Sequence, residues 1–182
     1  MRADELMRAT IRILTEGAEL ESGSAAGHVR RALNKLMDLQ QVVQEARSLP
    51  EGFAEFKEQV VRLLNSGRNP AGLSIYTFDC FNYAMRGRLD GFSRACHRRS
   101  ALQLLNDEYT PWSELLIPDD LDEIMEIDET LEEVSDDAPP VPEAAIPSWV
   151  PDTHWWWRAP KRQDMTAEER AERIDYDSND GL

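Results

Sequence analysis

The residues best suited to binding in this chain are tryptophans near its C-terminal end. Trp149 is followed by three consecutive indoles, Trp155, Trp156 and Trp157. Each indole can bury on the order of 150–250 Å² of surface, so three adjacent rings are seldom left in water. In an extended segment the middle ring faces away from its two neighbours, which suits a clasp on a partner protein. The alternative is that the rings fold back onto helices of the same chain.

A cluster of arginines is the second candidate binding surface. Its members are Arg86, Arg88, Arg94, Arg98 and Arg99. Aromatic residues lie close by in the sequence, and arginines interleaved with aromatic rings can bind phosphate groups and stack on bases. The competing interpretation pairs these arginines with carboxylates of residues 107–137, because an intramolecular contact benefits from a high effective concentration.

Residues 107–137 contain 14 acidic and no basic side chains. Apolar residues run through this segment at helical spacing, and Asp119 and Asp120 behind Pro118 suit the first turn of a helix. We therefore predict an acidic amphipathic helix. The apolar residues that we expect to dock into a partner groove are Leu121, Ile124, Met125 and Leu131. Two alternatives are a helix that is solvated or docked on its own chain, and a row of carboxylates that imitates nucleic acid.

Side chains that could carry out catalysis or hold a metal are few. Cys80, Cys96 and His97 lie within one region, but they do not complete a set of four zinc ligands. His28 and His154 stand alone in the sequence, and a run of solvated carboxylates does not make an acid and base pair. We expect no catalytic residues, no metal and no cofactor.

The distribution of charge limits the partners. The 182-residue chain has a net charge of −15, yet residues 1–106 carry 15 Lys and Arg against 12 Asp and Glu, a balance of +3. Residues 107–182 carry 5 against 23, a balance of −18, which repels phosphate. Nucleic acid is therefore disfavoured as a partner of the tail and remains an alternative for the arginine cluster. A protein partner is expected, and no feature specifies an oligomeric state.

Cysteine content and hydropathy suggest where the chain resides. Two cysteines are too few for a disulfide framework, and the first residues do not resemble a signal peptide. The longest apolar stretches fall far short of the roughly 20 residues that cross a bilayer. We expect a cytoplasmic protein without membrane contact.

The elements that must position these residues are predicted to be helices. Apolar spacing predicts helices over 2–20, from Ser24 to about 46, over 53–64 and over 92–106. Ser48 to Glu51 has the pattern of a capping box at the start of the third helix, and residues 68–72 are expected to break the chain. Over 73–85 the pattern favours helix over strand only slightly.

The C-terminal part is predicted to be extended. Five prolines between 138 and 151 favour a polyproline-like linker, and Thr166 to Glu169 predicts the cap of a short final helix. We therefore predict an all-α fold, with a helical bundle of four to five helices over 1–106 and an extended acidic, Pro-rich, Trp-bearing tail. This tail comprises an acidic amphipathic segment, 107–137, and a segment with the linker, the Trp cluster and the terminal helix, 138–182.

These features favour a non-enzymatic interaction or assembly protein, an adaptor that docks a partner protein through its acidic, Trp-bearing tail. One alternative is an acidic mimic of nucleic acid that inhibits a nucleic-acid-binding protein, since small acidic proteins of this kind are frequent among phage and mobile-element accessory proteins. Another is a nucleic-acid-binding regulator that uses the arginine cluster from Arg86 to Arg99.

Overall fold

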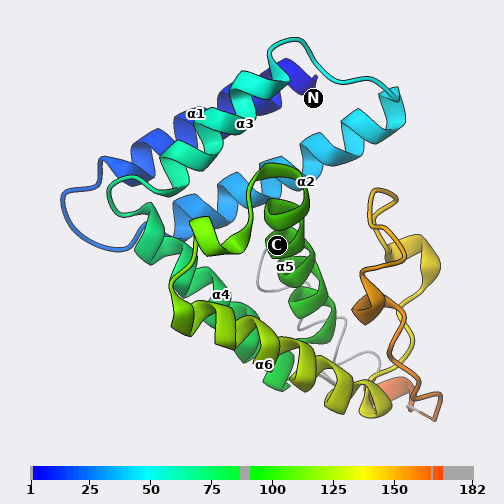
Figure 1. Cartoon of the computed structure of the whole chain (residues 1–182). Helices are drawn as coiled ribbons and strands as arrows, with labels where there is room; N and C mark the ends of the chain where they lie inside the picture. Colours follow the sequence, from blue (N-terminus) through cyan, green and yellow to red (C-terminus); the bar gives the residue numbers. More distant parts are fainter. Residues whose placement is uncertain (1, 87–90, 165, 170–182) are drawn as a thin grey trace. The chain divides into compact units, whose positions relative to one another are not determined.

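The computed structural model describes residues 2–86, 91–164 and 166–169. Within those residues the chain forms helices and turns and no strand, so the prediction of an all-α fold is confirmed for them (Figure 1). The ambiguous stretch 73–85 lies inside a single helix, α4 (Asn69–Arg86).

The chain divides into two compact units, and each unit is assembled from separate stretches of sequence. Unit 1 comprises Met1–Tyr76 and Ala101–Leu121, and unit 2 comprises Thr77–Ser100 and Asp122–Leu182. All three boundaries fall within helices, because α4, α5 (Phe92–Leu104) and α6 (Pro118–Val134) each contribute residues to both units. A division of the sequence by charge does not reveal such boundaries.

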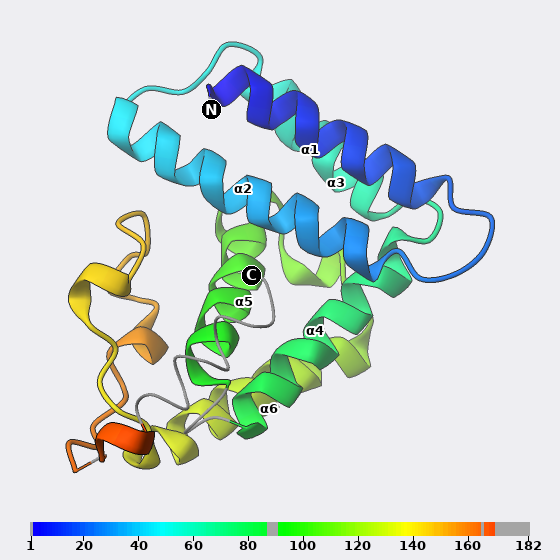
Figure 2. The ribbon, with the colours of Figure 1, turned by 180° about the vertical axis from the view of Figure 1, so that it is seen from behind.

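Three helices form the N-terminal part of unit 1. These are α1 (Ala3–Ala18), α2 (Ala26–Ala46) and α3 (Phe53–Leu64), and α1 packs against both of the others (Figures 1 and 2). Each helix buries apolar residues at spacings of three and four, which is the pattern of one face turned to a core. The buried positions include Leu6, Ile13, Leu14, Val29, Leu33, Leu36, Phe56, Val60 and Leu64.

The starts of α2 and α3 differ in how well they follow their predicted caps. The N-cap of α2 is Ala25, one residue after the predicted start at Ser24, although Oγ of Ser24 accepts a hydrogen bond from the backbone N–H of Ala26 at 3.1 Å. The capping box predicted for Ser48 to Glu51 is wrong, because α3 begins only after Gly52. Gly52 has a φ of 71°, a left-handed conformation that glycine adopts without steric cost.

The break predicted over 68–72 lies earlier in the chain, because residues 65–68 form the turn after α3 and residues 69–72 already belong to α4. Pro70 lies in the first helical turn, where a missing N–H costs no intrahelical hydrogen bond. Asn69, fully buried, donates from Nδ2 to the carbonyls of Leu14 and Leu63 at 2.8 and 2.9 Å. The polar residues that suggested a loop therefore fasten the start of α4 to neighbouring helices of unit 1.

In unit 2 the polypeptide beyond α6 has few regular elements but several fixed contacts. Between Ala138 and Pro151 the only helical segment is a 3-10 turn, Glu143–Ala145, and a second such turn covers Trp155–Trp157. The backbone N–H of Lys161 donates to the carbonyl of Ser135 at 3.0 Å, and that of Arg162 to the carbonyl of Ala138 at 2.8 Å. These bonds hold the returning chain beside the end of α6.

The predicted C-terminal cap is present, although most of the residues predicted to form its helix lie outside the described residues. The N–H of Glu169 donates to Oγ1 of Thr166 at 3.2 Å, and the N–H of Thr166 donates to Oε2 of Glu169 at 2.8 Å. This reciprocal pair is the capping box expected from the sequence. None of the described helices combines the length and apolar character that a membrane span requires.

Candidate functional site

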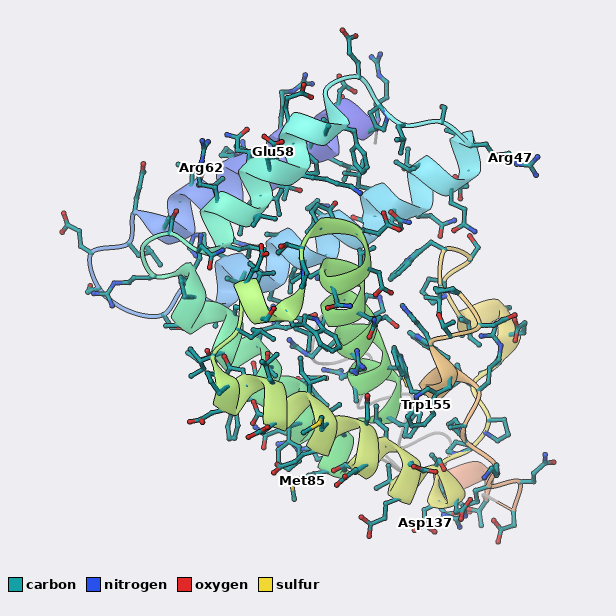
Figure 3. The ribbon with its side chains drawn as sticks, viewed as in Figure 1. Arg47, Glu58, Arg62, Met85, Asp137 and Trp155 are labelled. Atoms are coloured by element: carbon teal, nitrogen blue, oxygen red, sulfur yellow. The ribbon has the colours of Figure 1, made fainter. Side chains whose placement is uncertain are left out.

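Three of the four C-terminal tryptophans that were candidates for partner binding are buried within unit 2. Trp149, Trp156 and Trp157 are 7%, 2% and 3% exposed, whereas Trp155, which is labelled in Figure 3, is 37% exposed. The extended geometry expected for the triplet is wrong, because the residues form a 3-10 turn. Three residues per turn send successive side chains in different directions, so one indole points outward while its two neighbours turn inward.

The buried indoles converge on one hydroxyl group of α5. Nε1 of Trp157 donates to Oγ of Ser100 at 2.9 Å, and Nε1 of Trp156 donates to the same oxygen at 3.1 Å. The N–H of Trp156 is shared with the carbonyl of Cys96 at 3.2 Å. Nδ1 of His154 lies 3.0 Å from the Ser100 oxygen. Ser100 therefore ties three side chains of the 154–157 segment to α5.

Ring stacking encloses this polar centre. The imidazole of His154 stacks on the indole of Trp156, with centroids 4.8 Å apart and planes 22° apart, and Trp149 meets the same imidazole edge-on. The guanidinium carbon of Arg99 lies 4.5 Å from the centroid of Trp156, a cation–π contact. His97 meets Trp157 at 73°. The indoles thus form the core of unit 2 together with α5.

A two-pronged ion pair joins α5 to α6 beside these rings. Nε and Nη2 of Arg99 donate to the two carboxylate oxygens of Asp128 at 2.7 and 2.9 Å. Arg99 is 4% exposed, so its charge requires this partner in order to remain buried. The pairing of an arginine with the acidic segment, one of the two interpretations of the arginine cluster, is observed at this position.

The remaining arginines gather around a tyrosine. The guanidinium carbons of Arg86, Arg94 and Arg98 lie 6.0, 5.5 and 5.0 Å from the ring centroid of Tyr83. Arg94 is 4% exposed, and Arg88 lies outside the described residues. Because Arg94 and Arg99 point into unit 2, the cluster is not a continuous exposed surface in the part of the chain that the structure describes.

The serine and histidine pair has the composition of a nucleophile and a base, but its surroundings indicate a structural role. Ser100 is 0% exposed and His154 is 2% exposed. Two indole N–H groups occupy the lone pairs that a serine oxygen would use in attack on a substrate. The geometry therefore gives this pair no access to a substrate.

Both cysteines are buried thiols. Sγ of Cys80 donates to the carbonyl of Ala95, and Sγ of Cys96 to the carbonyl of Trp156, each at 3.5 Å. Burial raises the pKa of Cys80 to about 12, against which the nearby cations Arg98 and Arg99 act only in part. A thiol in this environment is a poor nucleophile. Among the described residues, no three His, Cys, Asp or Glu side chains are grouped as metal ligands.

The apolar residues predicted to dock from α6 separate into two sets. Ile124 and Leu131 are 2% and 0% exposed and belong to the core of the protein, and Leu121 is half-buried. Met125 is 60% exposed. Of the predicted partner-binding residues, Met125 and Trp155 therefore remain on the surface.

The outer side of α6 in unit 2 is acidic. Asp122, Glu126, Glu129 and Glu133 are all exposed, and their spacing of four, three and four places them on one side of the helix. We call these four residues the acidic face. Asp122 and Glu129 lie three residues before and four after Met125, so an exposed methionine is flanked by carboxylates.

Unit 1 contains an open groove of about 400 Å³ between α1 and the start of α3. It is lined by Met7, Arg8, Ile11, Arg12, Gly52, Glu55, Phe56 and Gln59. Its lining combines apolar residues, Met7, Ile11 and Phe56, with charged residues, Arg8, Arg12 and Glu55. It contains no serine, cysteine or histidine. It supplies no arrangement of nucleophile and base.

Sequence reasoning missed Ser100 and treated His154 as an isolated residue. Their contact joins positions 54 residues apart, so no local pattern reveals it. One signal was available, because Ser100 follows Cys96 by four residues and therefore lies on the buried side of α5. A serine on the buried side of a helix needs a polar partner. The N–H groups of the three consecutive indoles and the imidazole of the preceding His154 could supply one.

Comparison with protein-family models, curated proteins and solved structures finds no match to this chain.

Proposed function

We propose that this chain is a non-enzymatic interaction protein that binds a basic partner protein through the acidic face of α6, with Met125 as an apolar anchor. The observation that carries the proposal is the exposure of Asp122, Glu126, Glu129 and Glu133 along one side of a helix whose opposite side is buried. The helix backbone fixes the relative positions of these four residues before a partner binds, which lowers the entropic cost of binding.

The arrangement of charge is unfavourable for the isolated protein. Like charges three or four residues apart on a helix destabilise it by roughly 0.2–0.5 kcal/mol per pair. Residues 107–137 contain no lysine or arginine that could relieve this repulsion locally. A partner with positive charge relieves it from outside, so the same residues oppose folding and favour association.

Met125 supplies the apolar contact that a charged surface lacks. Interfaces derive much of their affinity from a few apolar or aromatic anchors surrounded by a polar rim. A methionine suits this role because its unbranched, polarizable side chain adapts to an irregular pocket. The partner that fits this surface has a shallow apolar pocket bordered by lysine or arginine.

A narrower candidate is that the basic partner is itself a nucleic-acid-binding protein. The regular row of carboxylates on a fixed helix supports this reading, since it offers negative charge where a phosphate backbone would otherwise bind. Competition distinguishes the two candidates. If DNA or RNA displaces the chain from its captured partner, the acidic face acts as a nucleic-acid mimic.

The test compares two variants with the same change in charge. The first neutralises the acidic face by Asp122→Asn, Glu126→Gln, Glu129→Gln and Glu133→Gln. The control neutralises four exposed residues of unit 1 by Glu19→Gln, Glu21→Gln, Glu45→Gln and Glu58→Gln. Each full-length chain is immobilised and exposed to extract of the cells that express it.

The proposal requires a protein that the wild type and the control retain and that the acidic-face variant loses. The same protein should be released by raising salt from about 0.05 to 0.5 M, because screening weakens contacts between exposed charges. Equal retention by all three chains contradicts the proposal.

A further inference from the structure

Two indole N–H groups and one imidazole nitrogen surround the Ser100 hydroxyl. A serine oxygen has two lone pairs and one proton. The N–H groups of Trp156 and Trp157 are directed at this oxygen at 3.1 and 2.9 Å, and that of Trp156 is shared with the carbonyl of Cys96. Nδ1 of His154 lies 3.0 Å from the same oxygen, where it can accept the serine proton.

When Nδ1 of His154 accepts the proton of Ser100, the ring is neutral and carries its own proton on Nε2. Protonation of the ring turns Nδ1 into a donor, so the Ser100 proton loses this acceptor. The imidazolium N–H and the N–H of Trp157 then compete for the Ser100 oxygen with the N–H of Trp156, which also reaches the carbonyl of Cys96.

Charged and titratable groups from three elements lie near the ring of His154. From α5, Arg99 lies over Trp156, on which His154 stacks, and its partner Asp128 comes from α6. His97 and Cys96 of α5 contact Trp157 and Trp156, respectively. From the 143–158 segment, Arg158 pairs with Glu143 and Asp152 at the surface. The buried cation of Arg99 disfavours a second positive charge on His154.

We propose that His154 is an acid-sensitive latch, whose protonation releases the 149–157 segment from α5 and exposes Trp149, Trp156 and Trp157. In the closed state these indoles are buried, and in the open state they form an apolar surface. The latch is independent of the acidic face, because neither Ser100 nor His154 belongs to it.

Quenching of tryptophan fluorescence by acrylamide tests the latch. The full-length chain is titrated from about pH 8 to pH 5, the interval in which imidazole is the side chain that ordinarily titrates. Two variants accompany the wild type. His154→Asn keeps an oxygen acceptor near the position of Nδ1 but does not titrate. His97→Asn removes the neighbouring imidazole, which meets Trp157 edge-on, while Ser100, His154 and both indole donors remain.

For the wild type and His97→Asn we expect the quenching constant to rise about twofold as the pH falls, because three of the five indoles change from buried to exposed. For His154→Asn we expect no rise, and circular dichroism should show that all three chains stay helical. An unchanged quenching constant in the wild type overturns the latch. A rise of equal size and midpoint in His154→Asn also overturns it, because another group would then be responsible.

If His154→Asn does not fold, NMR of the wild type decides. The midpoint of the His154 ring-proton titration should coincide with the midpoint of the quenching change. Separate midpoints overturn the proposal.

Discussion

Oγ of Ser100 and Nδ1 of His154 lie 3.0 Å apart, a buried contact that joins α5 to a segment 54 residues further along the chain. Two indoles donate to the same oxygen, so three side chains of unit 2 meet at Ser100. Residues 138–164 are therefore part of a folded unit, while the acidic face and Met125 remain exposed.

Removal of this hydroxyl should destabilise unit 2. Ser100→Ala leaves the N–H of Trp157 without its acceptor, and a buried donor without a partner costs on the order of 1–3 kcal/mol. We expect the free energy of unfolding to fall by about 2 kcal/mol, measured by urea denaturation. Thr153→Ala, at an exposed position beside His154, serves as the control and should change it by less than about 0.5 kcal/mol. Equal effects of the two substitutions would show that the hydroxyl is dispensable.

The ion pair of Arg99 and Asp128 should contribute far more than a surface pair of the same kind. Asp128→Asn leaves a guanidinium that is 4% exposed without its counter-charge, and we expect a loss of about 2–3 kcal/mol in the free energy of unfolding. Asp136→Asn provides the comparison, because Asp136 and its partner Lys161 are 79% and 72% exposed. That substitution should cost less than about 0.5 kcal/mol. Urea denaturation at two salt concentrations measures the free energy of unfolding of both variants. Equal losses for Asp128→Asn and Asp136→Asn would contradict the prediction.

Two glycines with positive φ angles should respond differently to alanine. At Gly67 a Cβ atom would lie 2.0 Å from the carbonyl oxygen of Ala18, whereas at Gly23 it would meet nothing within 4 Å. Gly23→Ala therefore incurs only the backbone cost of roughly 1–2 kcal/mol. Gly67→Ala adds a clash with backbone and should lower the melting temperature by clearly more than Gly23→Ala. Equal shifts would show that α1 can move away from Gly67 without cost.

Cys80 should make the protein less stable at alkaline pH. Its pKa is raised from 9.0 in the unfolded chain to about 12 by burial, so between these values the folded state keeps a proton that the unfolded state loses. The unfolded state then binds fewer protons, and the free energy of unfolding falls as the pH rises, by up to about 1.4 kcal/mol per pH unit. The stabilisation is complete below pH 9 and lost towards pH 12.

Cys80→Ser isolates this contribution. A serine keeps a donor for the carbonyl of Ala95 but does not titrate in this range, so its free energy of unfolding should depend less steeply on pH. Denaturation of both chains at several pH values between about 8.5 and 10.5 makes the comparison. If the free energies of unfolding of both chains fall equally with pH, the Cys80 thiol does not contribute to the pH dependence.

The helices that the sequence predicted best are those whose apolar spacing is regular. Apolar spacing predicted α1 and α2, because a helix that buries one side repeats its apolar residues every three or four positions. Pro118, followed by Asp119 and Asp120, indicated the start of α6. The start of α4 was missed, since Asn69 and Pro70 are typical of loops. Asn69 is helical here because its side chain finds acceptors at Leu14 and Leu63, and such distant contacts leave no local pattern.

The candidate site was predictable only in part. Composition identified the indoles and the acidic stretch. The sequence analysis expected Ile124 to dock into a partner groove, whereas in the structure it is 2% exposed. Whether an indole is buried depends on what lies opposite it in three dimensions. Ser100 supplies that partner for Trp156 and Trp157 from another segment, and Trp149 packs on His154, whereas Trp155 stays partly exposed.

The central claim, that the acidic face binds a basic partner, is tested most directly by the Kd of the captured partner for two chains. Calorimetric titration would compare the wild type with the variant in which Asp122, Glu126, Glu129 and Glu133 are neutralised. We predict at least about a tenfold weaker Kd for the variant at low salt, and a difference that shrinks as salt is raised. The same Kd for both chains at every salt concentration would contradict the account.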